Sequence, residues 1–370
     1  MPDEASSVLT IDLGAIAANY RLLQQRTDPA LCGAAVKANA YGLGAAMVVP
    51  MLHRAGCKHF FVATLDEALA LKPLLPTATV YVMNGLPAGA ARDLAAAELV
   101  PVLNTLPQIE EWRRFCTEKQ PRPAALQIDT GMARLGLSHG EMVRLIGDPR
   151  LLQDMPIALV MSHLACADDP EHPMNRRQLE FFCEMTQALR FAGAAMPKFS
   201  IAASSGIFLG ADFHLDLVRP GAALYGVAPT ISAPNPMRPV VRLQGKILQI
   251  RDVDLGMTVG YGASHKFQRP SRVATIGAGY ADGIPRALGN KGAVFIDGKR
   301  APIVGRVSMD LITVDIGQVP PQACQPGQFV DILGPQQSVD DLARDAGTIG
   351  YEVLTALGPR YKRRYLANPV

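Results

Sequence analysis

The sequence lacks the features that would place the protein outside the cytoplasm or inside a membrane. Its six cysteines include no C-x-x-C pair, which indicates reduced thiols. No apolar run approaches the roughly 20 residues that a membrane helix needs. The opening residues "MPDEASSVLT" carry acids where a secretion signal would have basic and apolar segments. We therefore expect a cytoplasmic protein with no membrane partner.

The chain also lacks a large excess of positive or negative charge. Lysines and arginines number 36 against 33 aspartates and glutamates, for a net charge of +3 over 370 residues. The one tight basic cluster is residues 360–364, which we interpret as a solvated tail; contact with an acid or a phosphate is the alternative. No nucleic-acid motif is present, so we expect no nucleic-acid partner. With 49% hydrophobic residues at this length, we expect a large domain plus a smaller one, or an elaborated barrel.

Short apolar runs alternate with longer helical patterns in the first part of the chain. The eight runs are residues 31–38, 59–64, 78–84, 99–104, 124–132, 157–165, 198–204 and 216–226. Helices are predicted for residues 11–26, 65–74, 106–117 and 175–192. Eight such units over roughly 220 residues predict a (β/α)8 TIM-type barrel with a parallel sheet. A doubly wound sheet is the alternative, but it would favour a Gly-rich fingerprint after the first strand, where this chain has Lys37.

The pattern changes after the eighth run. The segment "SAPNPMRP" at 232–239 is typical of a linker, and segments typical of strands follow it. The pair Asp297-Gly298 between two such segments predicts a β-hairpin, and a helix is predicted for residues 338–345. We therefore expect two domains, a (β/α)8 barrel over residues 1–230 and a C-terminal, mostly β domain over residues 231–370.

The ends of the predicted strands carry most of the reactive side chains, and function in barrels lies at these ends. The first strand ends in Lys37. Burial there would lower the pKa of the amine and make it an imine-forming nucleophile or a base; a surface lysine that starts a loop is the alternative. Asn39 and Tyr41 add polar groups close by, and glycines at 42 and 44 let a ligand approach the backbone.

The fifth and sixth strands end in basic side chains. Arg134 follows the fifth strand, and its planar guanidinium suits a carboxylate, although a structural ion pair is the alternative. His163 ends the sixth strand as either a catalytic or a core histidine. Cys166, Asp168 and Asp169 form only a weak metal pattern, so we expect no metal site.

The seventh and eighth strands run into small residues. These are residues 204–206 ("SSG") and the segment "RPGAALYG", which includes Arg219 and Gly221. Barrels often bind phosphate after these two strands, although plain turn chemistry is the alternative. An amine at the first strand and a phosphate site at the last two would hold a phosphorylated aldehyde between them, such as pyridoxal phosphate.

Six segments together resemble those of alanine racemase, of the fold-type III pyridoxal phosphate enzymes. They are "AVKANAYGLGA", "DTGMARLG", "RPGAALYG", "TVGYG", "GYADGIPR" and "GRVSMD", and with Tyr351 the matches extend over nearly the whole chain in the same order. The resemblance implies a barrel with a C-terminal β domain, pyridoxal 5'-phosphate as cofactor, and a head-to-tail homodimer in which each active site takes residues from both subunits.

The resemblance also implies catalytic roles. Lys37 matches the lysine that holds the cofactor covalently and acts as one of two bases, and Tyr261 matches the opposite base, contributed by the other subunit. A proton removed from one face of Cα and returned to the other inverts the centre. His163 and Arg219 match the residues that form a network to this tyrosine. Arg219 also matches the residue that meets the pyridine nitrogen, where a carboxylate would indicate a decarboxylase.

Further matches concern the phosphate and the substrate. The residues that match phosphate ligands are Tyr41, Ser205, Gly221, Ala222 and Tyr351. The residues that match substrate-binding positions are Arg134, the backbone of Met309 from the partner, Tyr280 at the entrance, and Asp310 in the same partner-derived wall. Tyr280 together with Tyr351 would narrow the entrance and favour a substrate with a small side chain.

One position departs from the family. Many members have a carbamylated lysine just before "DTGM", whose negative charge holds the carboxylate-binding arginine, whereas this chain has Gln127. Gln127 can hydrogen-bond Arg134 but cannot be carbamylated, so our hypothesis is that Gln127, with a bound anion such as chloride, orients Arg134. Some broader amino acid racemases also lack that lysine, which leaves the substrate range open.

We therefore expect an enzyme that interconverts L-alanine and D-alanine and supplies D-alanine for cell-wall peptidoglycan. A broader amino acid racemase, for example one acting on serine, is the nearest alternative. A non-catalytic pyridoxal phosphate-binding protein would normally lack the C-terminal β domain, and a fold-type III decarboxylase would not place Arg219 at the cofactor.

Overall fold

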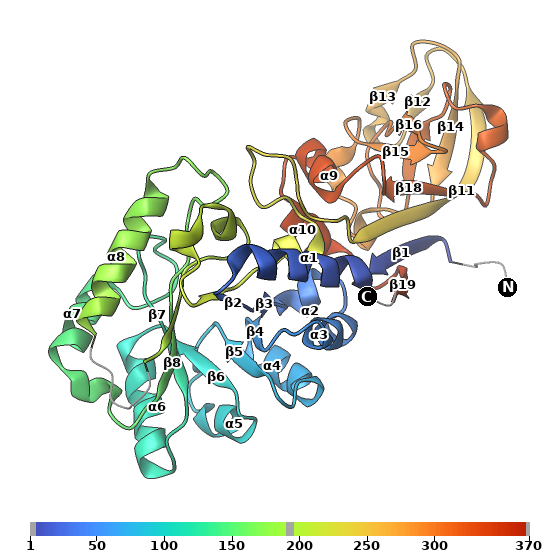
Figure 1. The fold of residues 1–370 in the computed structure, drawn as a ribbon. Coiled ribbons are helices and arrows are strands. Elements are labelled where there is room, and N and C mark those ends of the chain that lie inside the picture. The colour runs from blue at the N-terminus through green and yellow to red at the C-terminus, as the bar shows by residue number, and fades with distance from the viewer. Residues whose placement is uncertain (1–4, 190–195, 368–370) are drawn as a thin grey trace.

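The computed structural model describes residues 5–189 and 196–367. Figure 1 shows two regions, a helix-covered barrel built from the first part of the chain and a β-rich region built mostly from the last part. The predicted fold class, a (β/α)8-type barrel followed by a mostly β domain, is confirmed. Within the described ranges no helix has the length and apolar character needed to cross a membrane.

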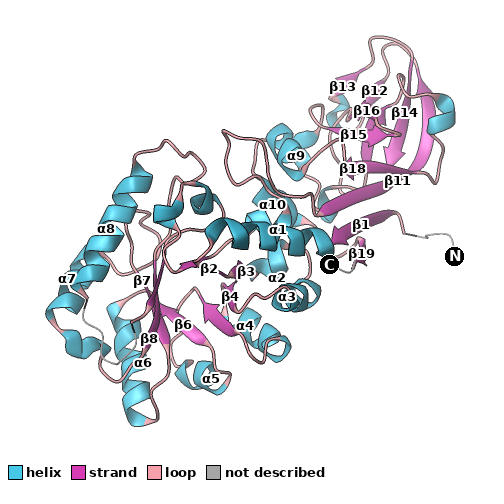
Figure 2. Cartoon of the chain, viewed as in Figure 1, coloured by secondary structure: helices cyan, strands magenta, loops and turns pink. Residues whose placement is uncertain are grey.

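Seven parallel strands form one sheet in chain order, and the sheet curls (Figure 2). They are β3 (Ala34–Ala35), β4 (His59–Val62), β5 (Thr79–Val82), β6 (Val100–Leu103), β7 (Ala124–Gln127), β8 (Ile157–Met161) and β9 (Lys198–Ser200). Most of their side chains are buried, as expected for a parallel sheet that is covered on both faces. This double burial explains why the strands appear in the sequence as apolar runs.

The eighth predicted run forms only a short strand, β10 (Leu217–Val218). It pairs in parallel with β2 (Leu31–Cys32), which directly precedes β3. On its other side, Arg219 forms a parallel bridge with Ala203 after β9. The last strand therefore joins the end of the sheet to its beginning, so that residues following all the strands can meet at one end of the barrel.

Helices cover the outside of this barrel (Figure 2). The helices of this region are α1 (Leu13–Thr27), α2 (Lys37–Tyr41), α3 (Ala45–Arg54), α4 (Leu65–Leu71), α5 (Ala91–Ala96), α6 (Leu106–Glu118), α7 (His139–Gly147) and α8 (Met174–Ala188). The helix predicted for 65–74 ends in a 3-10 turn at Lys72–Leu74, where Pro73 has no N–H to donate. The end of the helix predicted for 175–192 falls at 190–192, outside the described residues.

The β-rich region is built around one long strand, β11 (Val241–Val253), which pairs with three others. The other strands are β1 (Ser7–Asp12), β12 (Thr258–Val259), β13 (His265–Lys266), β14 (Ser271–Ile276), β15 (Ala293–Ile296), β16 (Lys299–Pro302), β17 (Ile312–Asp315), β18 (Phe329–Leu333) and β19 (Lys362–Leu366). The helix predicted from residue 11 begins only at Leu13, because the residues before it form β1, antiparallel to β11 and parallel to β19. The N-terminal strand of the chain therefore lies in the sheet made by its C-terminal part.

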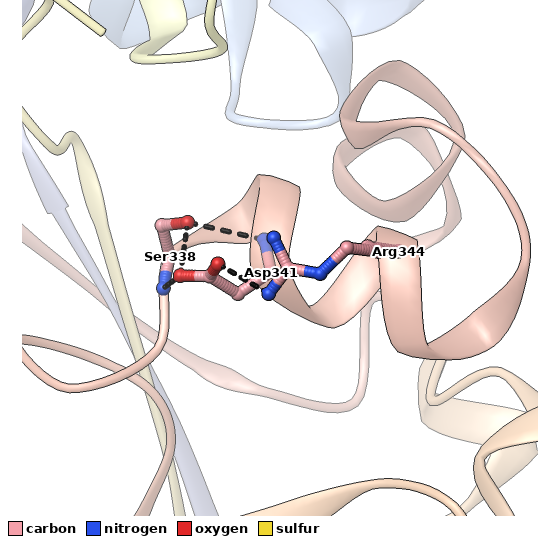
Figure 3. Close-up of polar contacts among 3 residues, drawn as sticks. All are labelled: Ser338, Asp341 and Arg344. Carbon is pink, nitrogen blue, oxygen red and sulfur yellow. Dashed lines mark hydrogen bonds and ion pairs between the residues drawn. The ribbon is translucent and has the colours of Figure 1, made fainter. Parts of the chain in front are cut away.

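Two local predictions in this region are confirmed. Asp297 and Gly298 both have positive φ angles, 49° and 74°, and join β15 to β16 in an antiparallel hairpin. Ser338 starts α9 (Val339–Ala346) through a capping box with Asp341, which also pairs with Arg344 at 2.7 Å (Figure 3). A further helix, α10 (Gly350–Ala356), leads back toward the barrel and packs against α2.

Residues 360–364 are exposed at Arg360, Lys362 and Arg364, as the interpretation of a solvated segment predicts, but the segment is ordered. Tyr361 is buried, and the residues after it form β19 beside β1. Arg363 donates from Nη1 to the carbonyl of Gly42 at 2.6 Å, which ties this segment to the loop after α2. Strand pairing and these side-chain bonds order a stretch whose high charge density resembles that of a solvated tail.

Candidate active site

Lys37 lies where β3 ends and α2 begins, and its side chain is half-buried. Burial lowers the pKa of its amine, and the charge of Arg134 lowers it further, while the carboxylate of Glu67 acts in the opposite direction. A lysine with a lowered pKa has a larger neutral fraction, which is the form that attacks a carbonyl or accepts a proton. The structure therefore gives Lys37 the environment of a reactive amine.

The backbone after Lys37 makes a left-handed turn. Residues 38–41 all have φ angles between 52° and 55°, although none of them is glycine. Such a conformation costs about 1–2 kcal/mol for each L-residue, so it persists only where the surroundings hold it. Glu67 Oε1 accepts from the N–H of Ala38 at 2.6 Å, and Asn39 Oδ1 accepts from the N–H of Ala45 at 2.8 Å. Glu67 thus braces the strained turn and also tunes the lysine beside it.

The residues that match phosphate ligands lie close together. The ring centroid of Tyr41 is 6.2 Å from that of Tyr351 on α10. Burial raises the pKa of the Tyr351 hydroxyl, and the Ser205 side chain beside it lowers that pKa. A Cβ added to Gly221 would lie only 2.2 Å from the Tyr41 hydroxyl oxygen, so glycine is required for this close approach. Ala222 follows at the start of a short 3-10 turn. Three hydroxyl-bearing side chains and the backbone at 221–222 therefore form a small polar cluster.

Ser204, predicted only as part of the segment at residues 204–206, holds this cluster in place. Its Oγ accepts from the backbone N–H of Gly221 at 2.9 Å and from that of Ala223 at 3.1 Å. The neighbouring Ser205 was chosen from the resemblance, and the two serines divide the work, since one supports the loop and the other reaches Tyr351. Adjacent serines give no local signal of such a division.

Arg219 is buried, with 4% of its surface exposed, at the end of β10. Its Nη2 donates to the carbonyl of Ser162 at 2.6 Å, and its Nη1 donates to Ser200 Oγ. Burial lowers its pKa to about 9, so the guanidinium still carries its charge at neutral pH. The side chain is therefore a fixed cation and donor among the strand ends.

His163 follows β8 in the same group of charges. Burial and the positive charges of Arg219, Arg134 and Lys37 lower its pKa to about 3. The imidazole is therefore neutral at physiological pH. The charges of Arg219, Arg134 and Lys37 all act on His163, which places the histidine near the other basic side chains that follow the strands.

A buried amide from outside the strands orders this region and was missed in the sequence. Gln178 on α8 donates from Nε2 to the carbonyl of His163 and to Thr130 Oγ1, both at 2.9 Å. Its Oε1 accepts from the N–H of Ala165 at 2.8 Å. A glutamine on a charged helix is normally read as solvated, so only the fully buried environment of Gln178 reveals the role.

Gln127 is buried at the end of β7. Its Nε2 donates to the carbonyl of Leu135 at 3.0 Å, which is the residue after Arg134. The structure thus places the Gln127 amide against the backbone of the loop that carries Arg134, whose own side chain is exposed.

The remaining predicted residues lie on the β-rich region of the same chain. Tyr261 is 71% exposed and Met309 is 53% exposed, and Tyr280 and Asp310 are exposed as well. Tyr261 stands between β12 and β13, which Figure 1 shows at the end of this region that is remote from the barrel. One chain alone therefore does not bring Tyr261 to Lys37.

The barrel end suits a phosphorylated carbonyl cofactor. It has a reactive amine, a fixed cation, and a polar cluster where the absence of a Cβ at Gly221 lets the Tyr41 hydroxyl approach the backbone closely. Lys37 would hold such a group covalently, the cluster at Tyr41 would hold its phosphate, and Arg219 would face its ring. Fold and site together define a barrel enzyme of the pyridoxal phosphate class with an appended β domain.

Comparison with known proteins specifies the family. The alanine racemase N-terminal domain model matches residues 11–229 and the C-terminal domain model matches residues 240–365. Alanine racemase of Rhodospirillum rubrum is 50% identical over 366 residues, which cover 98% of this chain and 96% of the relative. The catabolic alanine racemase of Agrobacterium fabrum is also 50% identical, with 98% and 92% coverage.

A solved structure agrees with these relatives. The crystal structure of alanine racemase from Bartonella henselae, which has covalently bound pyridoxal phosphate, has a TM-score of 0.94 and 45% identity to this chain. The match covers 98% of this chain and all of the other. The chain therefore belongs to the alanine racemase family, a family of pyridoxal phosphate-dependent enzymes.

Proposed function

We propose that this enzyme interconverts L-alanine and D-alanine by a two-base mechanism in a cytoplasmic homodimer, and that it supplies D-alanine for peptidoglycan. We also propose that its two domains divide near residue 230. The observation that carries the mechanism is the separation of the bases, since Lys37 sits within the barrel and Tyr261 is 71% exposed on the same chain. A head-to-tail partner would bring the partner's Tyr261 to the face of the substrate opposite Lys37.

The residues of the barrel have distinct tasks in this proposal. Bound pyridoxal phosphate withdraws electrons and makes the Cα hydrogen of an amino acid acidic. Lys37, with its lowered pKa, takes the proton from the face presented by D-alanine or returns one to it. Arg219 stays charged and only donates, so it does not accept a proton at the ring nitrogen, which limits side reactions such as transamination.

The other residues hold the substrate and the opposite base. Arg134 binds the substrate carboxylate together with the backbone of the partner's Met309. His163, neutral near pH 7, and Arg219 support the partner's Tyr261 as the second base. The partner's Tyr280 and this chain's Tyr351 narrow the entrance, which favours the methyl group of alanine over larger side chains.

Racemisation is tested by incubating the holoenzyme with L-alanine in D2O. We expect loss of optical rotation together with deuterium uptake at Cα. Release of the carboxyl carbon as CO2, or deuterium uptake without inversion, would contradict the proposal. A panel of L-amino acids in the same assay decides whether the enzyme is a broader racemase, the alternative that Gln127 favours. Deletion of the gene with and without external D-alanine decides whether the product feeds the cell wall.

The shared active site is tested by mixing two inactive variants. Lys37→Ala removes the base of the barrel, and Tyr261→Ala removes the opposite base. Dimers that contain one chain of each kind should have one intact site, so random mixing should restore about a quarter of wild-type activity. A mixture that stays inactive, although dimers with one chain of each variant form, would show that each chain builds its site alone.

A further inference from the structure

Arg360 connects two loops of the β-rich region that contribute to the proposed substrate wall. Its Nε lies 3.1 Å from Asp282 Oδ1, and its Nη1 lies 2.8 Å from Asp310 Oδ1. The side chain of Asp282 is only 4% exposed, whereas that of Asp310 is 54% exposed. One guanidinium therefore joins a buried carboxylate to an accessible one.

The two loops are also in direct backbone contact. The N–H of Tyr280 donates to the carbonyl of Ser308, and that of Ala281 donates to the carbonyl of Met309, both at 3.0 Å. A Cβ on Gly279 would lie 2.3 Å from the Met309 oxygen, so no larger residue fits there. The position of the Met309 backbone is therefore coupled to the turn that contains Asp282.

Asp282 anchors this turn to the rest of the region. Its Oδ2 accepts from the N–H of Gly279 at 2.8 Å, and its carbonyl accepts from the N–H of Gly358 at 3.0 Å. A buried carboxylate is strongly destabilising unless a cation and hydrogen bonds compensate it. Arg360 is the cation that the structure pairs with Asp282, and its planar shape lets it hold a second carboxylate in a fixed direction.

The segment that carries Arg360 also contacts the barrel of its own chain. Tyr351 on α10 belongs to the polar cluster near Tyr41, and Arg363 bonds the carbonyl of Gly42. Arg360 could therefore act on its own barrel through α10, or on the barrel of the partner through Met309. The direct contacts favour the second route, because both ion pairs of Arg360 lead to the loops at 279–282 and 308–310.

We propose that Arg360 is a positioning residue that fixes the Met309–Asp310 backbone for the substrate carboxylate bound in the partner's barrel. This inference rests on the proposed racemase function and its shared site. Without Arg360, Asp282 would be a buried charge with no counter-ion, and Asp310 would be free to turn toward solvent. The backbone at Met309 would then lose its fixed direction, which weakens substrate binding more than it slows proton transfer.

The first experiment compares Arg360→Met with Arg344→Met in the holoenzyme. Arg344 forms an ion pair of similar length with Asp341 (Figure 3), and both residues belong to α9. The arginine side chain is 72% exposed. We expect Arg360→Met to raise the KM for alanine about tenfold with kcat within about threefold of wild type. Arg344→Met should leave both values unchanged, and Arg360→Lys should recover part of the loss.

Two further measurements separate positioning from general stability. Hydrogen exchange of peptides covering residues 305–312 should be faster in Arg360→Met and unchanged in Arg344→Met. Asp310→Asn weakens only the exposed ion pair and leaves the buried one intact. It should therefore raise the KM less than Arg360→Met does, and it tests the proposal even if Arg360→Met folds poorly. An unchanged KM in Arg360→Met would overturn the proposal, as would changes of kcat and KM in Arg344→Met as large as those in Arg360→Met. If Arg360→Met does not fold, an unchanged KM in Asp310→Asn would overturn it.

The second experiment decides on which barrel Arg360 acts. Hybrid dimers of Lys37→Ala with Arg360→Met are purified through two different tags. In this hybrid the barrel with Lys37 belongs to the Arg360→Met chain, and the loops with Met309 and Asp310 that face it belong to the Lys37→Ala chain, which keeps Arg360. We therefore expect a wild-type KM. A KM equal to that of the Arg360→Met homodimer would show action on the chain's own barrel and overturn the proposal. The mixture of Lys37→Ala with Tyr261→Ala is the reference. If that mixture stays inactive, the shared site itself is rejected, and not only the role of Arg360.

Discussion

The two halves of the proposed active site differ in how far one chain orders them. In the barrel, Arg219 is 4% exposed and donates to two partners, and burial and neighbouring charges have shifted the pKa values of Lys37 and His163. In the β-rich region, Tyr261 is 71% exposed and Met309 is 53% exposed. In the proposed site, the barrel half is thus held by contacts within one chain, whereas the residues of the other half are exposed to a partner surface.

This difference predicts where each half is sensitive. Changes in the barrel should alter cofactor affinity and pKa values that can be measured without turnover. Changes in the β-rich region should leave those properties intact and affect inversion or substrate affinity. Variants from each half can therefore break or sharpen the comparison.

The largest effect is expected for Tyr261→Phe. Removing one base should slow racemisation about 10³-fold, because a positioned acid–base group contributes on that order. Lys37 should still exchange the Cα hydrogen of D-alanine, so deuterium uptake into D-alanine should persist without inversion. Proton NMR in D2O with chiral chromatography measures both rates. Loss of exchange in both enantiomers would show that the two halves are not independent.

Gly221→Ala is expected to act on the cofactor. The new Cβ would lie 2.2 Å from the Tyr41 hydroxyl oxygen and 2.9 Å from Cζ, so the tyrosine must leave the polar cluster. A misfit of about 2 kcal/mol corresponds to roughly 30-fold weaker binding of pyridoxal phosphate to the apoenzyme. Equilibrium dialysis measures this affinity. Gly140→Ala on α7, where a Cβ meets nothing within 4 Å, is the control and should bind normally.

Much of the barrel half could be predicted from the sequence because its signals are local. Parallel strands buried on both faces read as apolar runs, and Lys37, His163 and Arg219 stand directly after such runs. The left-handed turn at 38–41 could not be predicted, since Ala, Asn and Tyr all favour other backbone conformations. Its stability depends on Glu67, which contributes from a different strand–helix unit.

Pairing between residues far apart in the sequence also limited what could be predicted from the sequence. Strand β1 pairs with residues that come more than two hundred positions later, so no local pattern distinguishes it from the start of a helix. Gln178 looks like a surface residue in the sequence but is buried, and the two ion pairs of the exposed Arg360 are visible only in the tertiary structure. The proposed roles of Tyr261 and Met309 require a second chain, so their assignment rests on family resemblance.

Glu67→Gln should shift the titration of Lys37. The carboxylate favours the ammonium form, so removing its charge should lower the lysine pKa further, while the amide oxygen can still accept from Ala38. We expect the midpoint for labelling of Lys37 in the apoenzyme by an amine reagent to move to lower pH. Peptide mass spectrometry measures it, and Asp66→Asn, an exposed acid in the same turn, should cause no shift. A shift to higher pH would contradict the electrostatic role of Glu67.

The smallest effect is expected at Gln127, which belongs to the barrel half but acts on the substrate. Its Nε2 holds the Leu135 carbonyl at 3.0 Å, next to Arg134, and Leu at this position would leave that carbonyl without its donor. We expect Gln127→Leu to raise the KM for alanine about threefold with little change in kcat, because a neutral hydrogen bond contributes only about 1 kcal/mol. If an anion completes this site in place of the family's negative charge, replacing chloride by gluconate should raise the wild-type KM about twofold, and less in the variant. A wild-type KM that is indifferent to halide would assign the orientation of Arg134 to the glutamine alone, and the barrel half would then need no external ion to be complete.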